Sequence, residues 1–231
     1  MWYRQKDAVV LTLIVCDDVL FLVLAQKVYK KQYAILSYTS FKSSLYTLNN
    51  GIIYNYTVIK GAISSFLKKQ KIQPSFLTII IDNQQVATHF FAAVQPFSDE
   101  LIENKIMHKQ AHHMHYIGPF QDTDHLLYSC SVSQHVLLQY ELLGSFFNIP
   151  LLCISCWIHP LLYAYRGCKE TAFRSSVLTK DMVQYDKNFT DFFTQDMMHR
   201  FFYKIPIGEH MYKKAFLMTY GHLVYQEMLH G

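Results

Sequence analysis

Two adjacent aspartates, Asp17 and Asp18, interrupt the apolar segment LTLIVCDDVLFLVLAQ of residues 11–26. A pair of carboxylates can hold Mg²⁺ beside a nucleotide, because hard cations prefer oxygen ligands. Aspartate is also common in turns, where its side chain bonds to the nearby backbone. No third acidic residue lies near the pair in the sequence, so a hairpin turn with exposed carboxylates is the favoured interpretation.

The same segment has an alternative interpretation as a membrane-spanning helix. Residues 8–25 are long enough for a short span, but two central aspartates cost about 6 kcal/mol, which roughly cancels the contribution of the apolar residues. Both halves are rich in β-branched residues, which are typical of strands. The sequence therefore predicts a buried β-hairpin that turns at Cys16, Asp17 and Asp18.

A group of histidines has residue types that bind zinc: His108, His112, His113 and His115. His108 and His112 would share one helix face if the helix predicted to begin at Ser98 extended that far. A structural zinc site needs four well-spaced nitrogen or sulfur ligands, and a catalytic site needs three. Because the histidines lie in a polar segment ahead of Gly118, we predict a loop over residues 109–125 and no metal site.

Cys153 and Cys156 have the C-x-x-C spacing of redox and zinc sites. Here the motif lies inside an apolar segment, IPLLCISCWI, that predicts a strand. Residues three apart in a strand point to opposite faces, which disfavours a bridge between them. The five cysteines are an odd number without a secretory signal, so reduced thiols in a cytoplasm are expected. No Gly-x-Ser-x-Gly motif is present, and a hydrolase is not expected.

The composition indicates a folded chain with a substantial core. Of 231 residues, 51% are apolar, 16% aromatic and 16% charged, which excludes a disordered protein. The formal net charge of +4 comes from scattered lysines and not from a dense basic stripe. Nucleic-acid binding is therefore not expected.

The hydrophobic pattern predicts an α/β protein in which strands and helices alternate. Thr57 is the predicted cap of a helix over residues 57–72, and two strands are predicted around the turn at Asp82 and Asn83. We divide the chain into the first core strands at 1–41, a small inserted α+β subdomain at 42–122, and the remainder of the core with a helical C-terminal end at 123–231.

Four segments, in this order, resemble actin-like pilus assembly proteins of the PilM type, including the shorter HofM-like members. The segments are LIVCDDVLFLVL, NNGIIYNYTVIKGAISSFLKKQKI, VQPFSDELIENKI and LYSCSVSQHVLLQYELLGSFFNIPLLCISCWIHPLLYAY, within residues 8–170. The resemblance implies a ribonuclease-H-like core of the actin-like ATPase superfamily, related to the division protein FtsA. It also implies an inserted small subdomain, and the second half of the fold is shortened here.

The sequence departs from that family where ATP would bind. The family's first turn carries glycines that let backbone N–H groups approach the phosphates, whereas this chain has Cys16, Asp17 and Asp18 there. The second phosphate-binding hairpin has no counterpart between residues 170 and 208, and the adenosine-binding Gly-Gly turn is missing. We therefore expect a degenerate site, no catalytic residue and no cofactor, with Mg-ATP bound only if the site is retained.

By resemblance, the expected function is that of a cytoplasmic scaffold in a type IV pilus or type II secretion-like machine. The family holds the cytoplasmic tail of a PilN-like inner-membrane protein in a groove, which would place this chain at the inner face of the inner membrane through its partner. Our candidates for groove residues are Ile52, Tyr54, Phe97 and Leu101. The alternative is an active actin-like ATPase of pilus assembly or cell division. An FtsA-like membrane anchor is less consistent with the C-terminal segment, which lacks a basic face.

Overall fold

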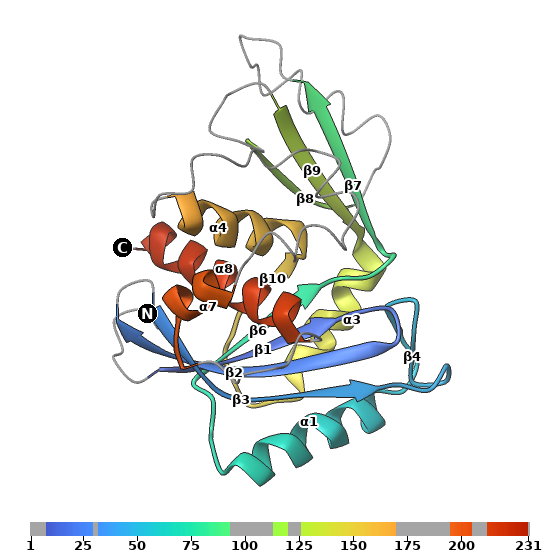
Figure 1. Cartoon of the computed structure of the whole chain (residues 1–231). Helices are drawn as coiled ribbons and strands as arrows, with labels where there is room; N and C mark the ends of the chain where they lie inside the picture. Colours follow the sequence, from blue (N-terminus) through green and yellow to red (C-terminus); the bar gives the residue numbers. More distant parts are fainter. Residues whose placement is uncertain are drawn as a thin grey trace.

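The protein is described by a computed structural model that covers residues 8–29, 32–92, 113–119, 126–169, 195–204 and 212–230. Strands predominate in the first part of the described chain, and helices are interspersed with strands toward its C-terminal end (Figure 1). Within these residues, no helix combines the length and the apolarity that crossing a bilayer requires.

The apolar segment at the start forms an antiparallel hairpin that continues into a third strand. The strands are β1 (Val9–Val15), β2 (Val19–Tyr29) and β3 (Gln32–Lys42). Val15 pairs with Leu20, so the predicted hairpin that turns at Cys16, Asp17 and Asp18 is confirmed, and the spanning-helix alternative is wrong. Residues 10–15 are all buried, because β1 lies between neighbours in the sheet and is covered on both faces.

Parallel strands complete a six-stranded sheet in the order β10-β6-β1-β2-β3-β11. These strands are β6 (Phe76–Ile81), β10 (Leu151–Cys156) and β11 (Phe202–Lys204). β6 runs parallel to both β1 and β10, and such doubly covered parallel strands carry continuous apolar sequences, here FLTIII. The predicted α/β class with a ribonuclease-H-like mixed sheet is confirmed.

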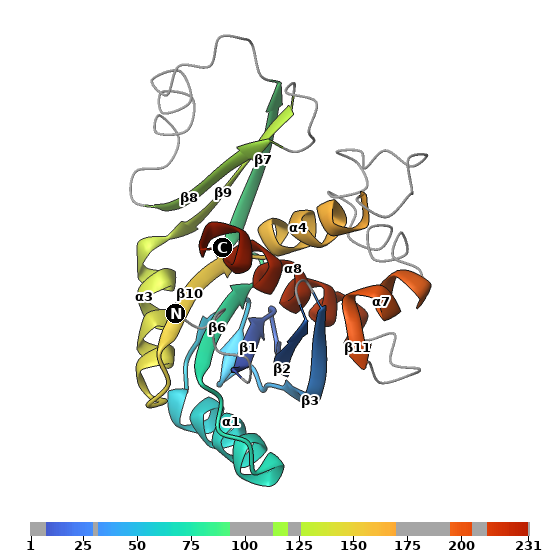
Figure 2. The ribbon, with the colours of Figure 1, turned by 90° about the vertical axis from the view of Figure 1, so that its left-hand side faces the viewer.

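A second, three-stranded antiparallel sheet interrupts this core. It consists of β7 (Val86–Ala92), β8 (His113–Pro119) and β9 (Leu126–Ser133), in the order β7-β9-β8. Figure 2 shows it projecting from the end of the central sheet. β6, which falls within the predicted insert at 42–122, lies between β1 and β10 in the central sheet. The division of the chain at 1–41, 42–122 and 123–231 stays a prediction.

The helix α1 (Tyr56–Gln70) follows a small hairpin of β4 (Leu48–Asn49) and β5 (Ile52–Ile53). The predicted helix is confirmed, but its cap is Asn55 and not Thr57. Asn55 has an extended backbone, with φ of −136°, and its Oδ1 accepts a hydrogen bond from the Val58 N–H at 3.2 Å. This geometry satisfies an N–H group of the first turn that has no partner within the helix.

Helices cover both faces of the central sheet. In Figures 1 and 2, α8 (Lys213–His230), α4 (Ile158–Lys169) and α7 (Gln195–Phe201) lie on one face, and α1 lies on the other. α3 (Gln134–Ser145) packs on the face opposite α8, where Gly144 lies near Leu151 and Ile79. α8 is buried nearly all round, because it lies between the sheet and α4; its buried apolar residues are Ala215, Phe216, Leu217, Met218, Tyr220, Leu223 and Val224.

α8 approaches α4 closely at Gly221. A Cβ atom at this position would lie 1.7 Å from the carbonyl oxygen of Pro160 and 2.8 Å from the backbone nitrogen of Ala164. Both of these atoms belong to backbone and cannot move aside as a flexible side chain can. Glycine is therefore required for the distance at which the two helices pack.

Behind Gly221, the buried His222 connects α8 to the parallel strands. One of its ring nitrogens, Nε2, lies 3.3 Å from the Thr78 Oγ1 in β6 and 3.5 Å from the Cys153 Sγ in β10. Burial is the main cause that lowers the pKa of His222 to about 3, and the charge of the nearby His159 is the smaller cause. Burial also raises the pKa of the Cys153 thiol to about 12, so both groups are neutral near pH 7.

Two helix glycines should respond in opposite ways to alanine. We expect Gly221→Ala to lower the free energy of unfolding by about 2–3 kcal/mol, because the methyl group would overpack a backbone contact. Gly61→Ala is the matched control in α1, where a Cβ would meet nothing within 4 Å. It should raise that free energy by about 1 kcal/mol through helix propensity. Urea unfolding of both variants measures the difference, and equal effects would contradict the close approach.

The buried His222 should make the protein sensitive to acid. Its folded pKa of about 3 lies below its ordinary value of 6.5, so its contribution to stability is complete above pH 6.5 and is lost as the pH falls toward 3. We expect this group alone to lower the free energy of unfolding by up to about 1.4 kcal/mol per pH unit in that window.

Urea unfolding between pH 7.5 and 4.5 tests this dependence, with His222→Gln compared against wild type. The variant should have a shallower decline with acid, whereas His135→Gln, at an exposed histidine, should keep the wild-type slope. An unchanged slope in His222→Gln would show that another group causes the acid sensitivity.

Candidate functional site

The carboxyl ends of β1, β6 and β10 meet at one edge of the central sheet, because the three strands run parallel. Ligands in open α/β sheets bind outside such strand ends. The Asp82 N–H donates to the Val15 carbonyl and the Trp157 N–H donates to the Ile81 carbonyl, both at 2.9 Å. These bonds place Cys16, Asp82 and Trp157 side by side, so we take this edge as the candidate site.

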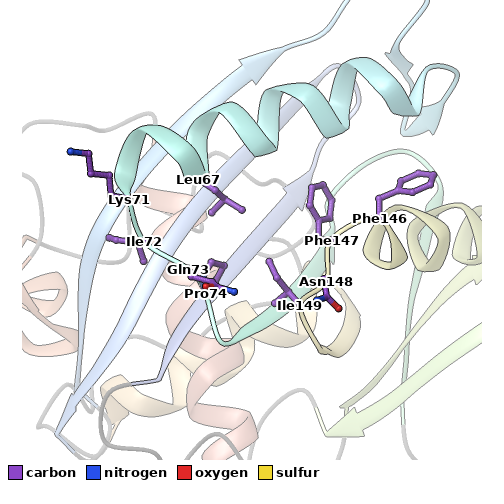
Figure 3. Close-up of a pocket in the computed structure, with 9 residues that line it drawn as sticks. All are labelled: Leu67, Lys71, Ile72, Gln73, Pro74, Phe146, Phe147, Asn148 and Ile149. Carbon is purple, nitrogen blue, oxygen red and sulfur yellow. The ribbon is translucent and has the colours of Figure 1, made fainter.

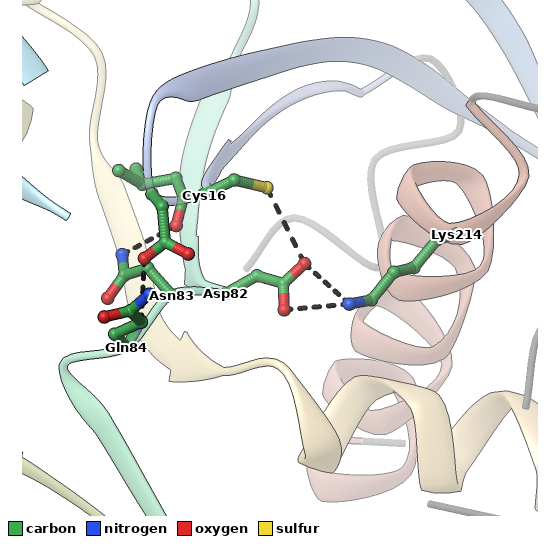
Figure 4. A network of polar contacts seen from close by, with 7 residues as sticks. Cys16, Asp82, Asn83, Gln84 and Lys214 are labelled. Atoms are coloured by element: carbon green, nitrogen blue, oxygen red, sulfur yellow. Dashed lines mark hydrogen bonds and ion pairs between the residues drawn. The ribbon is translucent and has the colours of Figure 1, made fainter. Parts of the chain in front are cut away.

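An ion pair between Asp82 and Lys214 fills the centre of the edge (Figure 4). The Lys214 Nζ lies 2.9 Å from each carboxylate oxygen of Asp82. The side chains retain only 22% exposure for Lys214 and 12% for Asp82, and the Lys214 ammonium also lies 5.4 Å from the centroid of the Trp157 ring. The Lys214 ammonium, which α8 provides, thus occupies the position that a bound metal ion would take beside the Asp82 carboxylate.

The Cys16 thiol completes this cluster without becoming a nucleophile. Its Sγ lies 3.7 Å from the Asp82 Oδ2, to which it donates. Burial, and then the Asp82 carboxylate, raise the pKa of Cys16 far above its ordinary value. Nucleophilic attack requires the thiolate, so a thiol held in the protonated form has a structural role here.

Asp17 and Asp18 act as turn residues. The Asp17 Oδ1 accepts from the Gln84 N–H at 3.0 Å, and its carbonyl accepts from the Gly51 N–H at 3.1 Å. Asp18 is exposed, and its carbonyl accepts from the Ser43 N–H. Across the described ranges of the chain, no group of three or more His, Cys, Asp or Glu residues is arranged to hold a metal ion.

A buried amide and a tyrosine join the small β4–β5 hairpin to this edge. The Asn83 Nδ2 donates to the Val15 carbonyl at 2.8 Å and to the Tyr140 hydroxyl at 3.0 Å, and that hydroxyl donates to the Gly51 carbonyl at 2.6 Å. Gly51 has φ of +75°, and a Cβ there would lie 2.3 Å from the Asn83 Cγ. Burial raises the pKa of Tyr140, which therefore keeps its proton for this bond.

Sequence reasoning did not identify three residues of this site: Asn83, Tyr140 and Lys214. The predicted turn at Asp82 and Asn83 marked the right position without indicating its role. Lys214 is 132 residues from Asp82 and belongs to a segment predicted only as a helix, so no local signal connected the two.

The predicted groove residues are only partly within the described structure. Ile52 is half-buried in β5, and Tyr54 is exposed directly after it. Phe97 and Leu101 lie outside the described residues, so the predicted groove cannot be assembled from all four.

The histidine segment differs from its prediction where it is described. His108 and His112 lie outside the described residues, whereas His113 and His115 belong to β8. The predicted loop is therefore wrong for residues 113–119, because they pair with β9, with His113 opposite Ser133 and His115 opposite Ser131.

The two cysteines of the C-x-x-C motif lie in different surroundings, as predicted. Cys153 contacts His222 of α8, whereas Cys156 contacts Cys130 of β9. A hydrogen bond with Cys130, together with burial, raises the pKa of the Cys156 thiol. All three cysteines are free thiols, so the prediction that Cys153 and Cys156 do not bridge is confirmed.

No protein-family model matches the sequence, and no curated protein matches it. Several solved structures are similar in fold. One is the PilM–PilN type IV pilus biogenesis complex, matched with a TM-score of 0.56 and 11% identity over 69% of this chain and 50% of the other. Another is the cytoplasmic domain of EpsL, an inner-membrane component of the type II secretion system of Vibrio cholerae, with a TM-score of 0.41 and 5% identity over 66% and 57%.

The RuvC of T. thermophilus in complex with a Holliday junction substrate is also similar, with a TM-score of 0.45 and 13% identity over 96% of each chain. The chain spans about half of the length of the PilM–PilN match. At 11% identity, the match with a TM-score of 0.56 establishes a shared architecture and nothing more. The chain therefore has the fold found in the PilM–PilN structure, with its own ion pair at the carboxyl edge of the sheet.

Proposed function

We propose that the chain is a non-catalytic scaffold of a type IV pilus or type II secretion-like machine. In this proposal it lies in the cytoplasm at the inner membrane, where it binds the cytoplasmic tail of a PilN-like inner-membrane protein. The fold shared with the PilM–PilN complex supports the choice of machine and partner.

The single observation that carries the non-catalytic part is the Asp82–Lys214 ion pair. A phosphate site at a strand end needs free backbone N–H groups and a counter-cation that the phosphates can share. Here the ammonium is bound to both oxygens of Asp82. The N–H groups of Cys16, Gln84 and Gln85 donate to oxygens of the protein, and the hairpin turn adds two carboxylates that would repel a triphosphate.

We place the tail at exposed apolar residues around the β4–β5 hairpin, the hairpin patch, which comprises Leu45, Tyr46, Tyr54 and Val58. The Tyr54 N–H donates to the Thr47 carbonyl at 2.9 Å, which brings the two sides of the patch together. Half-buried Ile52 is two residues before Tyr54. An extended tail would bind such a surface through its backbone and a few apolar side chains.

The degenerate site should not bind Mg-ATP. We expect millimolar Mg-ATP to leave the melting temperature within about 1 °C of its value in Mg²⁺ alone, because a ligand that does not bind the folded state does not stabilise it. Differential scanning fluorimetry measures this shift. A rise of several degrees that Lys214→Ala alters, and that the exposed-site control Lys42→Ala leaves unchanged, would establish a working nucleotide site and contradict the proposal.

A PilN-like tail should bind at the hairpin patch. We expect fluorescein-labelled peptides of the cytoplasmic tails of PilN-like proteins from the source organism to bind the full chain in fluorescence anisotropy. Tyr54→Ser should weaken binding about tenfold, since a buried aromatic contact contributes on the order of 1–2 kcal/mol.

Tyr203→Ser is the matched control, because Tyr203 is 66% exposed, close to the 62% of Tyr54, and lies on the edge strand β11. It should leave the affinity unchanged. Failure of every tail peptide to bind would contradict the proposed partner, and equal effects of the two substitutions would contradict the proposed surface.

A further inference from the structure

We propose that a groove at the C-terminal end of α1 binds an acidic peptide segment that carries apolar side chains. The groove lies between the end of α1 and the loop from α3 to β10, and it has a volume of about 460 Å³ (Figure 3). The hairpin patch is at the other end of α1, about 20 Å away along the helix axis. This proposal is independent of the tail-binding function above.

The walls of the groove are apolar and its rim is polar. Leu67 lies in the last turn of α1 and Ile72 directly after the helix cap, whereas Phe146 and Ile149 come from the α3–β10 loop; all four are only partly buried. Figure 3 shows Leu67, Phe147 and Ile149 directed toward the space between the two segments. A concave surface of this kind accepts side chains that protrude from a partner.

The backbone holds the groove open. Lys71, the residue that caps the end of α1, has a left-handed backbone with φ of 54°, and its N–H donates to the Lys68 carbonyl. The Ser75 N–H donates to the Val9 carbonyl at 2.8 Å, and the Leu77 N–H donates to the Pro150 carbonyl at 2.9 Å. These bonds tie both walls to the central sheet, so a ligand would not have to order them.

The two chain segments that form the groove carry lysines and no acidic residue. Residues 60–81 and 142–158, which include both walls, contain no acidic residue. They contain four exposed lysines instead: Lys60, Lys68, Lys69 and Lys71. The nearest acidic residue in sequence to the second wall is Glu141, which lies in the middle of α3. Carboxylates on a peptide would find complementary charge on the α1 side, while its apolar side chains fill the groove.

The same features disfavour a membrane or a nucleic acid as the ligand. A flat bilayer would reach the lysines but could not enter a concave groove. A nucleobase would need an exposed aromatic face. Phe146 is already engaged, because its ring makes a T-shaped contact with Tyr56 at a centroid distance of 5.6 Å and the Lys60 ammonium lies over the ring, 5.3 Å from its centroid.

Fluorescence anisotropy at low ionic strength tests the proposal on the full chain. The probe is a fluorescein-labelled peptide of twelve residues that alternates Glu or Asp with Leu or Phe, and its partner peptide has Lys at every acidic position. We expect the acidic peptide to bind at least tenfold more tightly than the basic one. Lys71→Glu should weaken binding at least fivefold, and the exposed-site control Lys42→Glu, which changes the net charge equally, should not.

A second variant separates shape from charge. Asn148→Trp, at the exposed rim, should block the groove and weaken binding at least fivefold without any change in charge. Three outcomes would overturn the proposal: no binding of the acidic peptide, equal weakening by Lys71→Glu and Lys42→Glu, or unchanged binding to Asn148→Trp. Tighter, Lys71-dependent binding of phosphatidylserine vesicles or polyuridylate would overturn it as well, in favour of a membrane or an RNA.

Discussion

The parallel pairing of β6 with both β1 and β10 is the constraint on which the rest of the structure depends. It buries the apolar run of β6 on both faces and aligns three strand ends at each edge of the sheet. At the carboxyl edge it places Asp82 beside Cys16 and Trp157. At the opposite edge it brings the end of α1 near the α3–β10 loop, because the Leu77 N–H bonds to the Pro150 carbonyl.

At the carboxyl edge of the sheet, the polar groups are paired with other groups of the chain itself. A carboxylate that lies this deep needs a partner, and α8 provides it in Lys214. The helix can reach the edge because Gly221 allows it to pack closely on α4 while His222 contacts β6 and β10. The pairing of polar groups and the packing of the helices therefore act together at this edge.

The exposed surface has two distinct regions at the two ends of α1. Aromatic and aliphatic side chains gather near its start, around the β4–β5 hairpin. At its end, lysines border an apolar groove. A helix C-terminus carries a partial negative charge, so lysines there also stabilise α1. The same lysines can therefore stabilise the helix and attract a ligand.

The sequence by itself determined the features that depend on neighbouring residues. β-branched runs and the aspartate turn specified the first hairpin, and strand alternation separated Cys153 from Cys156. Only the tertiary structure decided which strands pair and which helix meets the carboxyl edge. The apolar sequence of β6 would be the same whether the strand lay in an insert or in the core. Lys214 is 132 residues from Asp82, so no local pattern links the two. Burial and charge pairing over the whole chain determine such contacts, and local sequence patterns therefore do not predict them.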